Sequence, residues 1–600
     1  MSCPVTHFAE NFGEAYAEIL PELGESIAQI LRFFGGRNIY GVGGDFAANL
    51  ITALSPHLDL SASSNEMHAG FSACGQAEIT GLGVALTTYT VGSLPCTSAA
   101  ALAITEKLPV VFISGAPGES EVSEHTIHHT VAPGSAWHAQ YDCALNAFRA
   151  LGMKAERLQG ARSERQPNMA GERFFQLVCE AYLNKQPVFI EIPRDLVFSK
   201  TQAIALPSSL SAITRDNFIL KGAELIAKQI ANKLAHSEKP LLFIGEGVKL
   251  NKPLCQQLMR LSHEYKLPYA TTRLAKGIFD EFDPLYVGCY NGILSDPTIR
   301  EFVDKQIDYV LEVDTSIQPQ DTNSAFNTGT HAIESFENKT VIKGTVQNQQ
   351  GLINIFDHLL KMTLPTFSVT LPMRDLAESA DEEKLDFHNL TRVLNSIQAK
   401  IEPSLVYLPE VGNSYFASYG LVTKRAELGR SWLTNPWYAA MGTSLPYARA
   451  VSKTIKQNNL TDVPVVITGD GGFNFQLNEL IHFQKEGLPL IIIYMRNDIY
   501  HLGKSGEQDI YQCSTPEFEP RTLIQAYGGI GLKCLTVGAF VHAMNTAIRK
   551  NSGLTLIEVP AMPTEEYQCY ELKMLNLYIK AKNGDPDAIE QWQSTTLDSQ

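Results

Sequence analysis

The chain has 600 residues, of which 44% are hydrophobic and 19% are charged, and its formal net charge is −16 at pH 7. A chain of this length is too long for one hydrophobic core and splits into several domains, either four or three with tails. The composition is typical of a folded, soluble protein, and the negative charge disfavours nucleic acid and anionic membranes as general partners.

The ten cysteines show no C-x-x-C pair and no regular spacing, which favours a reducing compartment. Residues 1–24 carry several acidic side chains and no continuous apolar run, and this argues against a signal peptide. No later run reaches the length of a membrane span. We therefore expect a cytoplasmic protein.

The first third of the chain alternates segments of helical pattern with segments of extended pattern. Helices are expected over 25–35, 45–54 and 98–108, and strands over 38–44, 83–92, 109–118 and 186–196. Such alternation is the signature of a parallel sheet covered by helices. The sequence therefore predicts a doubly wound domain over 24–200, preceded by an N-terminal extension over 1–23.

The same alternation returns twice further along the chain. Strands are expected over 239–248, 307–316 and 339–346, and a helix over 252–267. These elements predict a central domain over 215–365, and a charged linker over 374–386 follows it. The last domain is placed at 385–565, with a polar tail over 566–600. The predicted fold class is thus α/β, with three doubly wound parallel-sheet domains.

The last domain contains one complete strand–helix–strand unit. Its strands, over 463–468 and 488–495, are continuous apolar and β-branched runs of the kind buried on both faces of a parallel sheet. The helix between them, over 475–487, stops at Gly487. Its buried face is expected to carry Leu477, Leu480, Ile481 and Gln484. A right-handed crossover sets the two strands parallel.

Two oxygen-bearing side chains, Asp470 and Asn497, follow these two strands. Because the carboxyl ends of parallel strands meet at the edge where open sheets bind ligands, we expect the two side chains to converge. Carboxylate and amide oxygens suit Mg²⁺, which completes its octahedron with water and phosphates. Gly469, Gly471 and Gly472 would let backbone N–H groups approach a phosphate. Taken alone, G-D-G is more often an ordinary turn.

This spacing and its flanks resemble the thiamine diphosphate (ThDP) enzymes, in which G-D-G and a similarly spaced Asn anchor magnesium and the diphosphate of the cofactor. In that family the third protein ligand is the backbone carbonyl two residues beyond the Asn, which is Ile499 here. The resemblance implies the cofactors ThDP and Mg²⁺, with Asp470, Asn497 and Ile499 as the metal ligands.

ThDP chemistry requires a carboxylate at the pyrimidine N1′, because that hydrogen bond promotes the imino tautomer that deprotonates the thiazolium. Glu66, in the run SNEMHAGF after a short strand, matches the activating glutamate of the family. A glutamate at a helix start is also simply favourable to the helix dipole. The assignment of Glu66 therefore depends on its context in the chain.

Three further side chains narrow the resemblance. Asp45 lies at a strand-to-helix turn, where an N-cap is the plain alternative, and His128 and His129 lie in tandem on a loop, where solvent exposure is the plain alternative. Together they resemble the pyruvate decarboxylase branch, which includes indolepyruvate and phenylpyruvate decarboxylases. In that branch an Asp and a His-His pair manage protons over the thiazolium. The resemblance covers residues 24–565.

The run NPWYAAMGTSLPYA resembles the family segment that holds ThDP in its bent shape. Met441 would support the bend and the Ala439 carbonyl would accept the 4′-amino hydrogen, although Met441 could equally be a core residue. The resemblance places Gly412, Asn413 and Ser414 near the diphosphate or the substrate.

Three residues are candidate walls of the substrate pocket: Val411, Tyr415 and Leu502. The branch often has a small residue at the position of Tyr415. A tyrosine there would narrow the pocket and argues against a large indole side chain on the substrate.

One position departs from the branch. Pyruvate decarboxylases carry a glutamate six residues beyond the metal-binding Asn, and this sequence has Gly503 there. Glu507 and His501 are the candidates to take its place. Without that acid, the enamine formed by decarboxylation would persist and could attack a second carbonyl carbon.

The sequence thus supports a ThDP- and Mg²⁺-dependent lyase that decarboxylates a 2-oxo acid to an aldehyde through an enamine, with Glu66, Asp45, His128 and His129 as catalytic residues. The alternatives are a carboligase of the acyloin or acetolactate synthase kind and a catalytically idle ThDP-binding paralogue. The resemblance also implies a small-molecule substrate and a homodimer or homotetramer with active sites between subunits.

Overall fold

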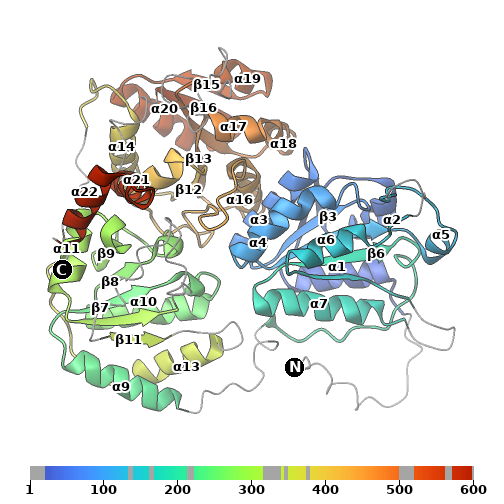
Figure 1. The fold of residues 1–600 in the computed structure, drawn as a ribbon, viewed down its shortest axis with the longest axis horizontal. Helices are drawn as coiled ribbons and strands as arrows, with labels where there is room; N and C mark the ends of the chain where they lie inside the picture. The colour runs from blue at the N-terminus through green and yellow to red at the C-terminus, as the bar shows by residue number, and fades with distance from the viewer. Residues whose placement is uncertain are drawn as a thin grey trace. The chain divides into compact units, whose positions relative to one another are not determined.

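The computed structural model describes residues 20–132, 139–160, 168–210, 213, 222–314, 339–342, 349–372, 379–498, 519–560 and 570–597. The chain divides into two compact units, Met1–Asn217 and Phe218–Gln600. The described residues form three sheets whose neighbouring strands are all parallel. The predicted class, α/β with three parallel-sheet domains, is confirmed (Figure 1).

The first unit is built on a six-stranded sheet with the strand order β2-β1-β3-β4-β6-β5. Its strands are β1 (Asn38–Gly41), β2 (Asp59–Ala62), β3 (Gly83–Thr87), β4 (Val110–Ala116), β5 (Lys154–Arg157) and β6 (Val188–Pro193). Its helices are α1 (Leu23–Phe33), α2 (Ala48–Leu54), α3 (Glu66–Thr80), α4 (Thr97–Thr105), α5 (Glu119–Ser123), α6 (Cys143–Ala150) and α7 (Ala170–Asn184). Every residue of β3, β4 and β6 is buried, as expected for strands covered on both faces.

The second unit contains the other two sheets. The central one has the order β11-β10-β7-β8-β9. Its strands are β7 (Pro240–Ile244), β8 (Tyr269–Thr271), β9 (Tyr286–Cys289), β10 (Tyr309–Val313) and β11 (Lys339–Ile342). Its helices are α9 (Ala223–Ala235), α10 (Lys252–Tyr265), α11 (Pro297–Gln306) and α13 (Gln349–Leu359). Helices α9 and α13 lie side by side (Figure 1).

The last sheet has the order β12-β13-β14-β16-β15. Its strands are β12 (Leu405–Pro409), β13 (Val463–Gly469), β14 (Leu490–Arg496), β15 (Ile530–Lys533) and β16 (Leu554–Pro560). Its helices are α14 (Phe387–Lys400), α15 (Asn413–Ala417), α16 (Ser444–Asn458), α17 (Asp470–Gln476), α18 (Leu480–Glu486), α19 (Pro520–Ala526) and α20 (Val537–Lys550). Two more helices, α21 (Tyr570–Lys582) and α22 (Pro586–Leu597), follow this sheet, and α21 packs against α15.

The helix between β13 and β14 differs from the sequence prediction in where it begins and which face it buries. It begins at Asp470, and the 3-10 turn η11 (Leu477–Glu479) separates α17 from α18. This turn shifts the helical phase. Leu480 is therefore buried as predicted, whereas Ile481 and Gln484 are exposed.

A buried ion pair ties the central sheet's loops to the last part of the second unit. The Lys276 ammonium lies 2.8 Å from Glu281 Oε2 and donates to the Leu421 carbonyl at 2.6 Å. The same Glu281 oxygen accepts from the Thr423 N–H at 3.0 Å. These contacts satisfy both buried charges, which would otherwise be strongly destabilising.

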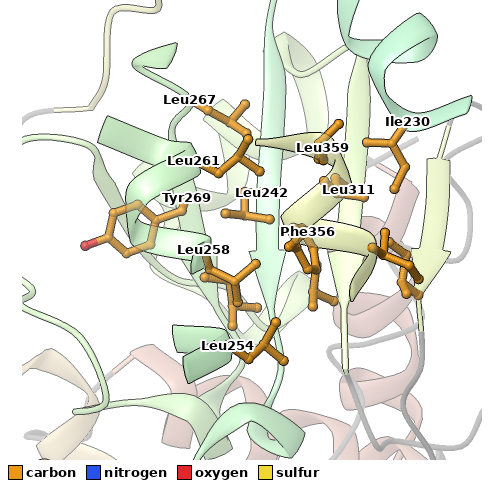
Figure 2. Close-up of a cluster of buried hydrophobic side chains, with 14 of the residues drawn as sticks. Ile230, Leu242, Leu254, Leu258, Leu261, Leu267, Tyr269, Leu311, Phe356 and Leu359 are labelled. Carbon is orange, nitrogen blue, oxygen red and sulfur yellow. The ribbon is translucent and has the colours of Figure 1, made fainter. Parts of the chain in front are cut away.

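The core of the central sheet is a continuous cluster of leucine and aromatic side chains (Figure 2). Strands β7 and β10 contribute Leu242 and Leu311, and α10 covers them with Leu254, Leu258 and Leu261. Leu258 is fully buried. Among the described residues, no helix has both the length and the apolar character that a membrane span requires.

The central core gives a direct test of packing. Leu258→Ala should lower the free energy of unfolding of the second unit by about 2–5 kcal/mol, because a buried leucine is replaced by a cavity. Leu225→Ala, on the exposed side of α9, is the matched control and should change it by less than about 0.5 kcal/mol. Denaturant titrations measure both, and equal effects would contradict this description of the core.

Candidate functional site

The carboxyl ends of β12, β13 and β14 lie side by side in the last sheet. Asp470 begins α17 directly after β13, and Asn497 follows β14. The Asn497 backbone N–H donates to Asp470 Oδ2 at 2.9 Å. The structure thus places side by side the two residues that the sequence paired.

Tyr494 adds a contact that sequence reasoning missed. Its hydroxyl donates to Asp470 Oδ1 at 2.7 Å, so each carboxylate oxygen accepts one hydrogen bond from β14 or the residue after it. The Tyr494 ring packs edge-on against Phe473, with ring centroids 5.2 Å apart. Burial, and then the nearby Asp470 charge, raise the pKa of Tyr494 well above its usual range, so its hydroxyl stays a donor at any physiological pH.

Asp470 is suited to a hard cation. Its carboxylate is only 3% exposed, and each oxygen keeps a lone pair after the contacts from Tyr494 and Asn497. A buried carboxylate without a nearby cation is costly, and Mg²⁺ would offset that cost. The donor chemistry therefore fits the predicted magnesium. Ile499, the third predicted ligand, lies outside the described residues.

The turn after β14 is held by its own ion pair. Arg496 Nε donates to Asp498 Oδ1 at 2.8 Å, and Arg496 also faces Glu558 at the end of the neighbouring β16. Asp498 has a positive φ of 58°. These contacts of Arg496 fix the backbone on both sides of Asn497.

A buried glutamate, which the sequence analysis did not single out, joins three segments around this edge. Glu410, after β12, accepts hydrogen bonds from the Gly442 and Ser444 N–H groups at 3.0 and 3.2 Å, and from Gln476 Nε2 of α17 at 2.6 Å. Burial raises the pKa of the Glu410 carboxyl, against the lowering effect of the hydrogen bonds from Ser444 and Gln476. Glu410 therefore fixes the loop before α16 against the helix that begins at Asp470.

Gly472 is required by this close approach. A Cβ at that position would lie 2.2 Å from Glu410 Cγ. The second glycine after the Asp therefore makes room for the buried carboxylate of Glu410, a role different from the phosphate approach predicted for it. Gly469 and Gly471 lie on either side of Asp470 at the strand–helix junction, half-buried.

The loop that carries Ala439 and Met441 is held by hydrogen bonds of the Asn435 side chain. Asn435 Oδ1 accepts from the Ala440 N–H at 2.6 Å, and its amide nitrogen donates to Thr443 Oγ1 at 2.8 Å. Ala439 has a positive φ of 54°, and Met441 is 39% exposed. The alternative that Met441 is a core residue is therefore wrong for this unit, and its side chain is available to a ligand.

Loop residues after β12 surround the same edge. Gly412 has a φ of 123°, which favours glycine, and a Cβ there would meet open space. Asn413 is exposed at the start of α15, Ser414 is buried and Val411 is half-buried. Gly412 and Asn413 are thus exposed at the end of β12, the strand that neighbours β13.

Of the other two predicted pocket walls, Tyr415 lies within the described residues and Leu502 does not. Tyr415 is 3% exposed and packs among Phe416, Tyr419 and Trp432 in the core of the last sheet. Its part in a substrate pocket stays a prediction. Leu502 lies outside the described residues, together with Gly503, His501 and Glu507.

In the first unit, Glu66 begins α3 as predicted. Asn65 is the N-cap, and its side chain accepts from the His68 N–H at 2.8 Å. The helix follows β2, so Glu66 lies at the carboxyl edge of the first sheet. Cys96 donates its thiol to the Glu66 carbonyl at 3.1 Å, and this contact fixes the backbone at the helix start.

The other three predicted catalytic residues of this unit contact one another. His128 Nδ1 lies 3.1 Å from Asp45 Oδ2, and His129 Nε2 lies 3.3 Å from Asp45 Oδ1. Asp45 opens the 3-10 turn η2 (Asp45–Ala47) after β1, and Gly44, not Asp45, is its N-cap. A carboxylate between two imidazoles can position both rings and stabilise either as a cation, which is what proton transfer requires.

The two halves of the predicted chemistry therefore lie in different units. The first unit offers Glu66 and the Asp45–His128–His129 cluster, and the second offers Asp470 with Asn497. One set can exchange protons, and the other can hold a metal and a phosphate.

Comparison with known families agrees with this division. The N-terminal TPP binding domain of thiamine pyrophosphate enzymes matches residues 21–135, their central domain matches 227–354, and their C-terminal TPP binding domain matches 410–559. The last match contains Asp470 and Asn497, and the first contains Glu66.

Curated relatives match over most of their length. A thiamine metabolism regulatory protein of Saccharomyces cerevisiae is 22% identical, over 88% of this chain and 87% of that protein. A probable pyruvate decarboxylase of Schizosaccharomyces pombe is 24% identical, over 90% and 94%. An alpha-keto-acid decarboxylase of Mycobacterium tuberculosis is 23% identical, over 91% and 95%.

Proposed function

Because the chain belongs to the thiamine pyrophosphate enzyme family, we propose that it is a ThDP- and Mg²⁺-dependent decarboxylase of a 2-oxo acid. The reaction is a carbon–carbon lysis that releases CO₂ and an aldehyde. The observation that carries the proposal is the buried Asp470 carboxylate beside Asn497 at the carboxyl edge of two adjacent parallel strands. The names of two relatives, pyruvate and alpha-keto-acid decarboxylase, support the reaction class.

When bound, ThDP would supply the carbon nucleophile and the electron sink that decarboxylation of a 2-oxo acid needs. Asp470, Asn497 and the Ile499 carbonyl would hold the Mg²⁺, and the backbone of Gly412 would approach the diphosphate. Glu66 would hold a proton at the pyrimidine nitrogen. Asp45 would keep the His128 and His129 imidazoles in position to deliver a proton to the product.

A homodimer or homotetramer is part of this proposal, with the first unit of one subunit facing the second unit of another. Exposed apolar side chains near Asp470 support it. Phe475 of α17 is 59% exposed and adjoins the loop of the exposed Met441, since a Cβ at Gly442 would lie 3.0 Å from Phe475. An assembly that covers these side chains would remove apolar surface from water. The described cysteines are all free, which suits the cytoplasm.

Two alternatives keep the same cofactor. Gly503 in place of the family glutamate favours carboligation to an acyloin as the second half-reaction. The relative named as a thiamine metabolism regulatory protein favours a ThDP-binding chain without turnover. The presence of Glu66 argues against this second alternative, because anchoring a diphosphate does not need that carboxylate.

Glu66→Gln tests the enzyme proposal. Turnover of 2-oxo acids should fall at least about 100-fold, since an amide cannot hold the proton that a carboxylate holds. ThDP binding in calorimetry should persist, because the diphosphate contacts lie elsewhere. Glu172→Gln, in the first turn of α7, makes the same change of charge at a helix start and should leave turnover intact. Full activity of Glu66→Gln would refute the assigned role.

Tyr494→Phe tests the metal site with the loss of one oxygen atom. The Mg²⁺ concentration that half-saturates ThDP binding should rise about tenfold or more, because the hydrogen bond that orients Asp470 is removed. Tyr407→Phe is the matched control, since Tyr407 is buried in the same sheet and its hydroxyl has no partner among the described residues. An unchanged Mg²⁺ requirement in Tyr494→Phe, or an equal shift in both variants, would contradict the metal assignment.

Gly503→Glu separates aldehyde release from carboligation. The new carboxyl group should supply the missing acid and shift the products of a 2-oxo acid towards free aldehyde. Mass spectrometry of aldehydes and acyloins from the two proteins measures the ratio. If the unmodified protein already releases only aldehyde, the carboligase alternative fails.

A further inference from the structure

The Asp45–His128–His129 cluster has a second chemical property, independent of the cofactor. Its ligand atoms, one carboxylate oxygen and two imidazole nitrogens, all lie within 4.8 Å of one another. The two nitrogens face the same carboxylate at 3.1 and 3.3 Å. Two histidines and one carboxylate are the ligand set of many zinc and other transition-metal sites.

Packing fixes this arrangement before any ion binds. Both imidazoles pack on the buried ring of Phe46, with centroids 5.4 Å from it, and lie 4.2 Å from each other. Phe46 follows Asp45 directly in η2, so the carboxylate and the ring under both histidines come from one turn. The cluster is therefore preorganised by neighbouring residues, and binding an ion costs little further side-chain entropy.

The distances suit a small divalent ion. Two ligand atoms about 2.1 Å from zinc at a tetrahedral angle lie about 3.4 Å apart, close to the two contacts of Asp45. Half of the His128 side chain and nearly half of the Asp45 side chain are exposed, so an ion can enter and keep water in its remaining position. Imidazole nitrogen favours Zn²⁺, Cu²⁺ or Ni²⁺ over Mg²⁺.

We propose that Asp45, His128 and His129 bind a transition-metal ion, with Zn²⁺ the expected occupant, at a site separate from the Mg²⁺ site at Asp470. Both facing nitrogens offer lone pairs to the ion, and any proton they carry moves to the other ring nitrogen or to solvent. If the chain also works as the proposed decarboxylase, bound Zn²⁺ withdraws both imidazoles from proton transfer and inhibits it.

The test is a titration of the full-length protein with Zn²⁺ by calorimetry, in the presence and absence of saturating Mg²⁺ and ThDP. One equivalent per chain should bind when Mg²⁺ and ThDP are present, and a second equivalent in their absence would belong to the Asp470 site. His128→Gln should weaken Zn²⁺ binding at least about tenfold. Loss of a residue that only contacts a metal ligand already weakens binding about tenfold or more, and His128 is itself a ligand. His125→Gln changes an exposed histidine of the same loop and should bind as the unmodified protein does.

Co²⁺ identifies the ligand type in parallel. Weak visible bands without thiolate charge transfer should appear, and they should be lost in His128→Gln but not in His125→Gln. Thiolate bands, or equal Zn²⁺ affinity in His128→Gln and the unmodified protein, would overturn the proposal. Because binding is measured without turnover, failure of the proposed decarboxylase activity would leave this result unaffected.

Discussion

The pairing of Asp470 with the end of β14 is the contact on which the second unit's site depends. It exists because β13 and β14 are parallel neighbours whose register brings Gly469 opposite Met495. Parallel pairing places both carboxyl ends at one edge, and the crossover through α17 and α18 covers the sheet without blocking that edge. The Asn497 N–H and the Tyr494 hydroxyl then orient a carboxylate that burial alone would disfavour.

Near this contact, Glu410 fixes neighbouring backbone segments by accepting their hydrogen bonds, as Tyr494 fixes the Asp470 carboxylate by donating one. One carboxylate collects donors from the loop before α16 and from α17, so segments from three parts of the last domain adopt a single relative position. The first unit uses the same principle with different groups, since Asp45 holds two imidazoles that Phe46 supports. In each case a carboxylate at a strand end is satisfied by donors from elsewhere in the chain.

The fold class and the placement of Asp470, Asn497 and Glu66 could be predicted from sequence, because these residues follow the ends of recognisable strands. The buried runs before Asp470 and Asn497 are local signals with a clear pattern, and Glu66 was placed at a helix start after a short strand. Short edge strands such as β5 and β15 lack such a run and were not predicted. The prediction that Ile481 lies on the buried face of α18 was wrong. The turn η11 changes the helical phase, and sequence periodicity cannot reveal such a change.

The contact of Tyr494 with Asp470 and that of Gly472 with Glu410 escaped prediction for a different reason. Tyr494 has the pattern of an ordinary buried strand residue. Its hydroxyl has a role only because Asp470 follows the neighbouring strand β13. Gly472 reads as part of a phosphate loop, whereas the side chain of Glu410, 62 positions earlier, sets its need for glycine. Contacts between residues far apart in sequence carry no local pattern.

The central claim is that a metal ion at Asp470 anchors ThDP to this chain, and calorimetry with ThDP before and after chelation of Mg²⁺ tests it most directly. We predict saturable ThDP binding in the presence of Mg²⁺. This binding should be lost on chelation, and it should be lost in Asp470→Ala even with Mg²⁺ present. Binding that survives chelation and the Asp470→Ala substitution, or no binding with Mg²⁺, would contradict it.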